Sequence, residues 1–122
     1  MRNFKELHVW SKAHTLTLAV YAATATFPRE ELFGLTGQTR RAAASVPANI
    51  AEGCGRGSNA ELARFLQTAA GSASELEYHL LLARDLDLLD TAAYDPLAVQ
   101  VVEVKRMLTT FVQKLNAYRE SS

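Results

Sequence analysis

The chain has 122 residues, of which 48% are hydrophobic and 21% are charged, and its formal net charge at pH 7 is zero. This length predicts one domain over residues 1–122, and the composition is typical of a globular protein. No apolar run approaches the ~20 residues that cross a bilayer, the first residues lack the apolar core of a signal peptide, and one cysteine excludes an internal disulfide. We expect a soluble protein of the reducing cytoplasm with no membrane partner.

The charges are unevenly distributed along the chain. Residues 1–64 carry a net charge of +3, and residues 65–122 carry −3. This polarity could draw phosphates to one face, or bring the basic part of one protomer to the acidic part of another. Ordinary solvated faces would give the same pattern, so both interpretations stay open.

Four segments show helical periodicity, and no segment resembles a strand. The first helix is predicted from about Glu6 to Thr26, before Pro28. Its apolar stripe comprises Trp10, Ala13, Leu16, Val20, Ala23 and Phe27. The second helix is predicted from about Glu30 to Glu52. Its inward positions are Leu32, Leu35, Thr39, Ala42, Val46 and Ile50.

The third helix is predicted from about Asn59 to Leu89, where Ser58 and Glu61 form a capping box at its start. One seam comprises Leu62, Leu66, Ala69, Ala73, Leu76, Leu80 and Ala83. Further apolar residues widen this seam around the helix: Phe65, Leu81, Leu82, Leu86, Leu88 and Leu89. Because this surface exceeds what one core face needs, we expect self-association.

In the fourth helix, Asp95 is the expected N-cap and Pro96 the first helical residue. Its seam has the alternating steps of four and three that shallow helix packing uses: Leu97, Val101, Val104, Leu108, Phe111, Leu115 and Tyr118. Short connectors favour antiparallel neighbours. The sequence therefore predicts an all-α fold, an antiparallel up-down-up-down four-helix bundle.

A proline motif interrupts the second helix, with Ser45, Pro47, Asn49, Glu52 and Gly53 as its marked residues. A proline inside a helix costs ~3 kcal/mol, because it removes one backbone donor and clashes with the preceding turn. The carbonyl of Ala43 loses its partner, and if it is buried a side chain or an ordered water must replace that partner; Ser45 and Asn49 are the nearby candidates. Glu52 lies near the helix end, where its charge needs a compensating arginine or the amino terminus of a neighbouring helix. Arg56, Arg40 or Arg41 could be that arginine. We interpret the motif as a structural polar cluster rather than a ligand pocket.

The candidate nucleic-acid contacts are basic. Arg40, Arg41 and Arg56 could bind phosphates, and Lys5, Lys12 and Arg64 would extend that patch. There is no recognition-helix signature, so binding would depend on shape or charge rather than base sequence.

Catalytic and metal-binding patterns are incomplete. His8, His14 and His79 are not spaced at i,i+4 from one another, and Glu75 with His79 is an isolated pair. Cys54 has no histidine beside it in sequence, and the glycines that flank it follow no strand. We expect no enzyme activity, no cofactor, no metal and no small-molecule substrate.

Three segments together resemble a known family. They are Leu35–Ala42, then Ser45–Gly53 followed by Arg56, then the segment from Ala70 to Leu76 that contains Gly71, Ser72 and Glu75. These segments, with the opening Phe4–Trp10, resemble the four-helix-bundle proteins encoded in 23S rRNA intervening sequences. The similarity runs in order along nearly the whole chain.

The resemblance implies more about shape than about activity. Members of that family are small antiparallel bundles that assemble into ring-like homopentamers. A distantly similar protein, the accessory variability protein of diversity-generating retroelements, binds nucleic acid and a reverse transcriptase. We therefore expect a non-enzymatic homopentamer that binds or scaffolds RNA or a ribonucleoprotein. The alternative is a purely protein-binding structural module.

Overall fold

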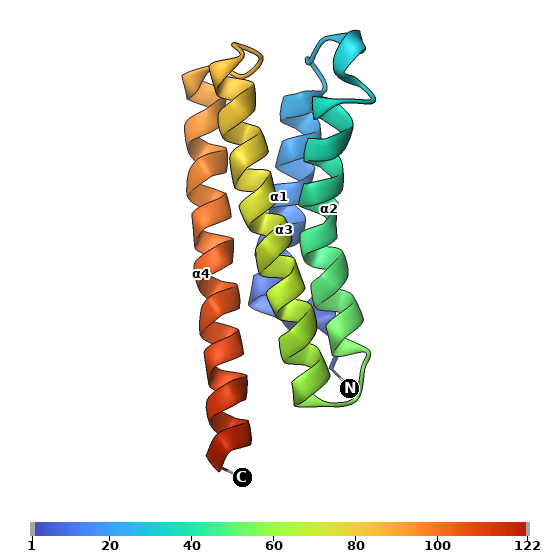
Figure 1. Cartoon of the computed structure of the whole chain (residues 1–122), viewed down its shortest axis with the longest axis vertical. Helices are drawn as coiled ribbons and strands as arrows, with labels where there is room; N and C mark the ends of the chain where they lie inside the picture. The colour runs from blue at the N-terminus through green and yellow to red at the C-terminus, as the bar shows by residue number, and fades with distance from the viewer. Residues whose placement is uncertain (1, 122) are drawn as a thin grey trace.

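The computed structural model describes residues 2–121, and it describes side chains for residues 2–118. Its four long helices are α1 (His8–Thr24), α2 (Leu35–Cys54), α3 (Asn59–Asp85) and α4 (Thr91–Ser121) (Figure 1). Short 3-10 helices, η1 (Phe4–Glu6) and η2 (Arg29–Glu31), precede α1 and α2. Consecutive helices are antiparallel and α4 also packs on α1, so the predicted up-down-up-down four-helix bundle is confirmed. Both ends of the chain lie at the same end of the bundle (Figure 1).

The core follows the predicted seams closely in α3 and less closely elsewhere. All seven seam residues of α3 are buried. In α2 the predicted inward residues are also buried, but Leu32 precedes the helix and is 46% exposed. In α4 the seam is buried at most positions, whereas Phe111 is half-buried and Tyr118 is 66% exposed. The seam therefore ends about one turn before the prediction, where α4 extends past its neighbours.

Helix α2 begins at Leu35, five residues later than predicted, because the chain first makes the η2 turn. The Glu31 carboxylate accepts a hydrogen bond from the Leu35 amide at 3.3 Å, which satisfies a free donor of the first turn. A Cβ on Gly37 would lie 2.9 Å from the Leu32 carbonyl oxygen. The turn can therefore fold back onto α2 only because residue 37 lacks a side chain.

Helix α3 ends at Asp85 rather than near Leu89, because Asp87 adopts a left-handed conformation with φ of 60°. The Leu88 amide donates to the Ala83 carbonyl at 2.9 Å, and the Asp87 amide donates to the Arg84 carbonyl at 3.0 Å. This is the hydrogen-bond pattern of a Schellman motif, which glycine usually closes. Aspartate tolerates the left-handed region better than most residues, so no glycine marks this helix end in the sequence.

Helix α4 begins at Thr91, so the predicted start at Asp95 and Pro96 is wrong. The Asp90 carboxylate accepts from the Ala93 amide at 2.9 Å and caps the helix one turn earlier. Pro96 lies inside the helix, where it removes the donor to the Ala92 carbonyl. Ala92 is exposed, so water can satisfy that carbonyl.

Candidate binding surfaces

The hydrogen bond that Pro47 removes from α2 is replaced from another helix. Thr17 of α1 is buried, and its hydroxyl lies 3.0 Å from the Ala43 carbonyl oxygen and 2.8 Å from that of Ala13. The predicted donors, Ser45 and Asn49, are therefore wrong. Around Pro47 the motif therefore has a structural role, because it adds a hydrogen bond between α1 and α2.

The remaining polar residues of the motif join α2 to α3. The Ser45 hydroxyl lies 2.8 Å from the Ser72 hydroxyl, and the Asn49 amide nitrogen donates to the Ser45 carbonyl at 2.8 Å and to its hydroxyl at 3.0 Å. A partly buried network of this kind is stable because each member finds a partner inside it. Residues from the second and third family-like segments thus meet in one cluster.

Three other residues of those segments have separate roles. Gly53 is buried at the α2–α3 contact, where a Cβ would lie 2.8 Å from the Cβ of Phe65. Gly71 is exposed, and a Cβ there would meet no neighbouring element within 4 Å. Glu75 lies at the surface of α3, with its Oε2 3.7 Å from Nε2 of the buried His79.

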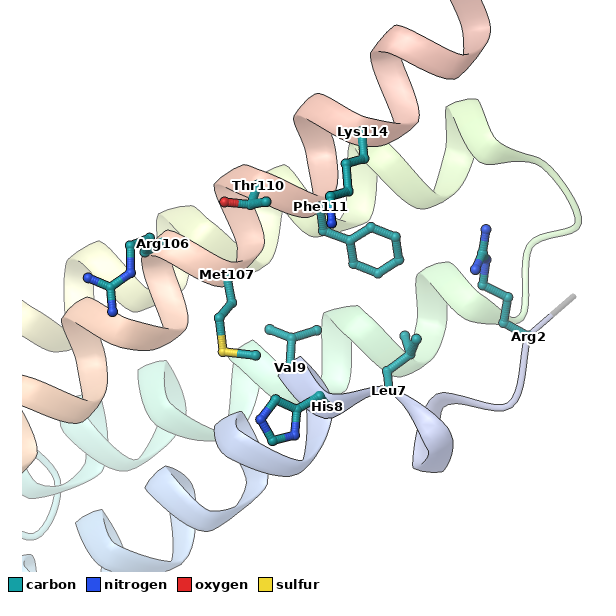
Figure 2. Close-up of a pocket in the computed structure, with 9 residues that line it drawn as sticks. All are labelled: Arg2, Leu7, His8, Val9, Arg106, Met107, Thr110, Phe111 and Lys114. Atoms are coloured by element: carbon teal, nitrogen blue, oxygen red, sulfur yellow. The ribbon is translucent and has the colours of Figure 1, made fainter.

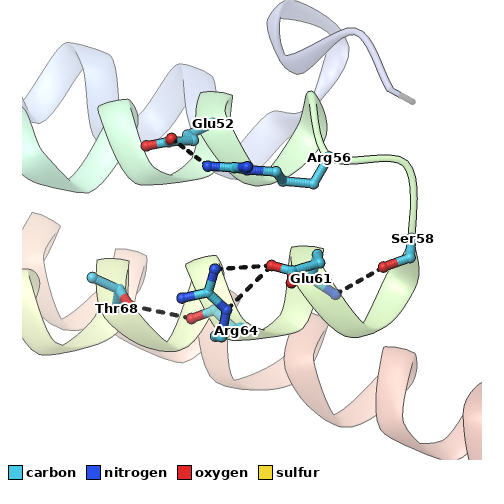
Figure 3. Close-up of polar contacts among 6 residues, drawn as sticks. All are labelled: Glu52, Arg56, Ser58, Glu61, Arg64 and Thr68. Atoms are coloured by element: carbon cyan, nitrogen blue, oxygen red, sulfur yellow. Dashed lines mark hydrogen bonds and ion pairs between the residues drawn. The ribbon is translucent and has the colours of Figure 1, made fainter.

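Glu52, Arg56, Glu61 and Arg64 form a surface cluster at one end of the α2–α3 face (Figure 3). The two arginines of the cluster cover the buried Phe65 ring. An Arg56 Nη2 to Glu52 Oε2 distance of 2.8 Å confirms the predicted cation for Glu52, and Arg64 pairs with Glu61 at 2.9 Å. The guanidinium carbons of Arg56 and Arg64 lie 5.0 and 4.5 Å from the centroid of the Phe65 ring. Each arginine is therefore already engaged by a carboxylate and a ring.

The other predicted cations lie apart from this cluster. Arg40, near the start of α2, donates to the Thr24 hydroxyl at 2.8 Å and lies over the Tyr21 ring, so it fastens the end of α1. Arg41 follows it and is exposed. Lys12 pairs with Glu103 at 3.1 Å, and Lys5 is exposed in η1. The six residues therefore do not form one patch, because α2 separates the first pair from the rest.

A groove of about 540 Å³ lies between the beginning of α1 and the second half of α4 (Figure 2). Its floor is apolar, formed by Leu7, Val9, Met107 and Phe111. Its rim is cationic and polar, formed by Arg2, His8, Arg106, Thr110 and Lys114. No carboxylate lines it among the residues that the structure describes.

Two of the rim cations form no ion pair with any side chain that the structure describes. Within residues 2–118, neither Arg106 nor Lys114 has an ion-pair partner, since the nearby Glu103 pairs with Lys12. The Arg2 guanidinium lies 5.7 Å from the centroid of the Phe111 ring, and the Arg2 amide donates to the Cys54 carbonyl at 2.9 Å. Sequence reasoning missed Arg2, Arg106 and Lys114. The only signal was the i, i+4, i+8 row of Arg106, Thr110 and Lys114 on one helix face.

The exposed face of α1 carries almost no charge. Between residues 13 and 28 the sequence contains no Asp, Glu, Lys or Arg. Leu18 is 58% exposed and Tyr21 44%, and on the neighbouring helix Val99 is 66% exposed. Lys12 pairs with Glu103 in an antiparallel register, which places Leu18 level with the first turns of α4.

The described side chains offer neither an exposed thiol nor a metal-binding cluster. Cys54 is buried, and burial raises the pKa of its thiol above the ordinary value of 9.0, although the nearby Arg2 charge opposes this. Among the described side chains, no three His, Cys, Asp or Glu residues converge as a metal site requires. None of the helices within residues 2–121 has the length and hydropathy needed to span a membrane.

Comparisons with known proteins identify the family. No curated protein matches the chain. A crystal structure from Bacteroides thetaiotaomicron, described as a protein of unknown function from the S23 ribosomal protein family, has the same fold, with a TM-score of 0.77 and 22% sequence identity. The match covers 85% of this chain and 97% of that one. The family model described as "23S rRNA-intervening sequence protein" matches residues 5–110. This chain therefore belongs to the 23S rRNA-intervening sequence protein family.

Proposed function

We propose that this protein is a non-enzymatic, cytoplasmic homo-oligomer, a ring of five copies, that binds or scaffolds a partner. The uncharged exposed face of α1 carries the self-assembly part of the proposal. This face exposes Leu18, Tyr21 and Ala22 with no charged residue among them, and an interface between copies likewise depletes charge at its centre. Val99 and Val102 add exposed apolar side chains on α4, a helix that packs against α1.

A protein partner is favoured over RNA. Lys12, Arg56 and Arg64 are paired with carboxylates, and Arg40 is bonded to α1. A phosphate would have to displace those partners, although surface ion pairs are individually weak. RNA or a ribonucleoprotein stays the second candidate, because a ring would repeat each unpaired cation five times and gain avidity.

Self-assembly is tested by light scattering coupled to size exclusion. The wild type should elute near five times the 13.4 kDa of one protomer. Leu18→Glu with Val99→Glu should elute as a monomer with unchanged circular dichroism, since carboxylates would be buried in the interface. Gln38→Glu with Gln67→Glu, at exposed positions of α2 and α3, adds the same two negative charges and is the matched control. A wild type that is monomeric throughout its concentration range would contradict the proposal.

RNA binding is tested by filter binding of a structured RNA across a salt series. If RNA is the partner, affinity falls steeply with salt, and Arg41→Glu weakens it without unfolding the protein. Arg41 is preferred to Arg40 for this test, because reversing the charge of Arg40 would also release α1. Absence of binding at low salt would eliminate RNA.

A further inference from the structure

We propose that the groove between α1 and α4 binds an acidic amphipathic helix of a partner protein. This rests on the scaffolding function proposed above, and it names the class of partner. The lining combines an apolar floor at Met107 and Phe111 with the cations Arg2, Arg106 and Lys114, and it contains no described carboxylate. A complementary ligand therefore has an apolar stripe flanked by negative charge.

The backbone N–H and C=O groups of the partner must find their hydrogen-bond partners within the partner itself. Most of the lining belongs to α1 and α4, and the segment before α1 that supplies Arg2 and Leu7 is not a strand, so the groove offers no sheet edge to which an extended peptide could add. An amphipathic helix brings its backbone already paired and presents apolar anchors at i, i+3 and i+4. The groove, with a volume of about 540 Å³, accommodates a few such side chains.

The cations set the spacing of the partner's charges. Arg106 and Lys114 are eight residues apart on α4, which is about 12 Å along the axis. A helix lying along α4 matches them with carboxylates seven or eight positions apart. Leucines between those carboxylates would reach Met107 and Phe111, which are four residues, or about 6 Å, apart along α4.

Fluorescence anisotropy with a labelled synthetic peptide tests the inference. The probe is a helical peptide with two glutamates seven positions apart and leucines between them on the same face. We expect saturable binding to the wild type that weakens at least tenfold in Arg106→Glu with Lys114→Glu, and similarly in Met107→Gln. The control variant combines Arg29→Glu, Gln38→Glu and Gln67→Glu, at exposed positions outside the groove. It gives the same change in net charge and should bind as the wild type does.

Peptide controls separate a groove from a charged surface. A scrambled peptide of the same composition, and one with lysines for glutamates, should bind at least tenfold more weakly. Equal binding of the scrambled peptide, or loss of binding in the control variant at residues 29, 38 and 67, would overturn the inference. Structured RNA that binds while the peptide does not would assign the cations to nucleic acid instead.

Molar masses measured on the same samples distinguish the two proposals. If the wild type is oligomeric and does not bind the peptide, only the groove inference is overturned. A monomeric wild type that binds the peptide overturns only self-assembly. If the groove variants change the molar mass and the peptide does not bind, the groove is filled by a second copy, and the inference is wrong.

Discussion

The hydroxyl of Thr17 explains how α2 tolerates a buried proline. Pro47 leaves the Ala43 carbonyl without its helical donor, and Thr17 lies 3.0 Å away on the facing helix. An unsatisfied buried carbonyl costs about 1–3 kcal/mol, so one side chain recovers much of what the proline removes. The sequence predicted that a donor was required but proposed the wrong residues, because local neighbours are visible in a sequence and a residue on another helix is not.

Thr17→Val should lower the free energy of unfolding by about 1–3 kcal/mol, because valine keeps the shape and removes the donor. The loss should be smaller in a Pro47→Ala background, where the new amide can bond to the Ala43 carbonyl. Urea unfolding of both single variants and the double variant measures this coupling. Additive losses would show that Thr17 does not compensate for the proline.

Cys54 gives a pH dependence with a defined sign. Burial raises the pKa of its thiol, so the folded state keeps the proton at pH values where the unfolded chain loses it. The unfolded state then binds fewer protons, and the free energy of unfolding falls as pH rises past the ordinary value of 9.0. Unfolding of the wild type against Cys54→Ala, between about pH 7 and pH 10, isolates this effect from the titration of lysines and tyrosines. A constant difference between the two proteins would contradict it.

At the scale of elements, two glycines within helices have opposite effects on stability. A Cβ at Gly53 would lie 2.8 Å from the Cβ of Phe65, so the close contact of α2 with α3 depends on that glycine. Gly71 faces open space in α3, where glycine only weakens the helix. The sequence shows both as glycines in one family-like pattern, and only the packing separates their roles.

Gly53→Ala should therefore lower the free energy of unfolding by about 1–3 kcal/mol through overpacking. Gly71→Ala should raise it by about 0.5–1 kcal/mol through helix propensity. Denaturant unfolding of the two variants in parallel is the measurement. Destabilisation by Gly71→Ala together with a reduced molar mass would place that glycine at a contact between copies.

The sequence predicted the existence and order of the helices, because a buried seam leaves a period of three and four residues. Three boundaries were wrong, because each depends on a local contact that has no strong sequence signal. Glu31 caps α2 from outside it, Asp87 ends α3 in a conformation usual for glycine, and Asp90 starts α4 before its proline. These are competing polar contacts of short range, which periodicity does not register.

At the scale of the whole molecule, the groove joins the two ends of the chain. Arg2 and Lys114 are 112 positions apart in sequence, and the antiparallel path of α1 and α4 brings them to one rim. The sequence places Arg106 and Lys114 on one face of the fourth helix, but it offered no reason to group them with Arg2. The predicted basic residues, by contrast, were grouped by sequence proximity, and the bundle separates them.

If the native state is an oligomer, its melting temperature depends on protein concentration, because unfolding of the assembly releases separate chains. We expect the melting temperature to rise with each tenfold increase in concentration. In Leu18→Glu with Val99→Glu it should stay constant, since that variant unfolds as a monomer. Differential scanning calorimetry at several concentrations measures both, and a constant wild-type value would contradict the assembly.

The bond between the Arg2 amide and the Cys54 carbonyl affects how this protein should be handled at the bench. An affinity tag fused ahead of residue 2 would emerge beside the rim of the groove, and a polyhistidine tag would crowd it. Pull-down experiments with an uncleaved amino-terminal tag would then under-report ligands of that site. A fusion at the carboxyl terminus, on the longer reach of α4 (Figure 1), leaves the Arg2 contact intact and is the better choice for isolating partners.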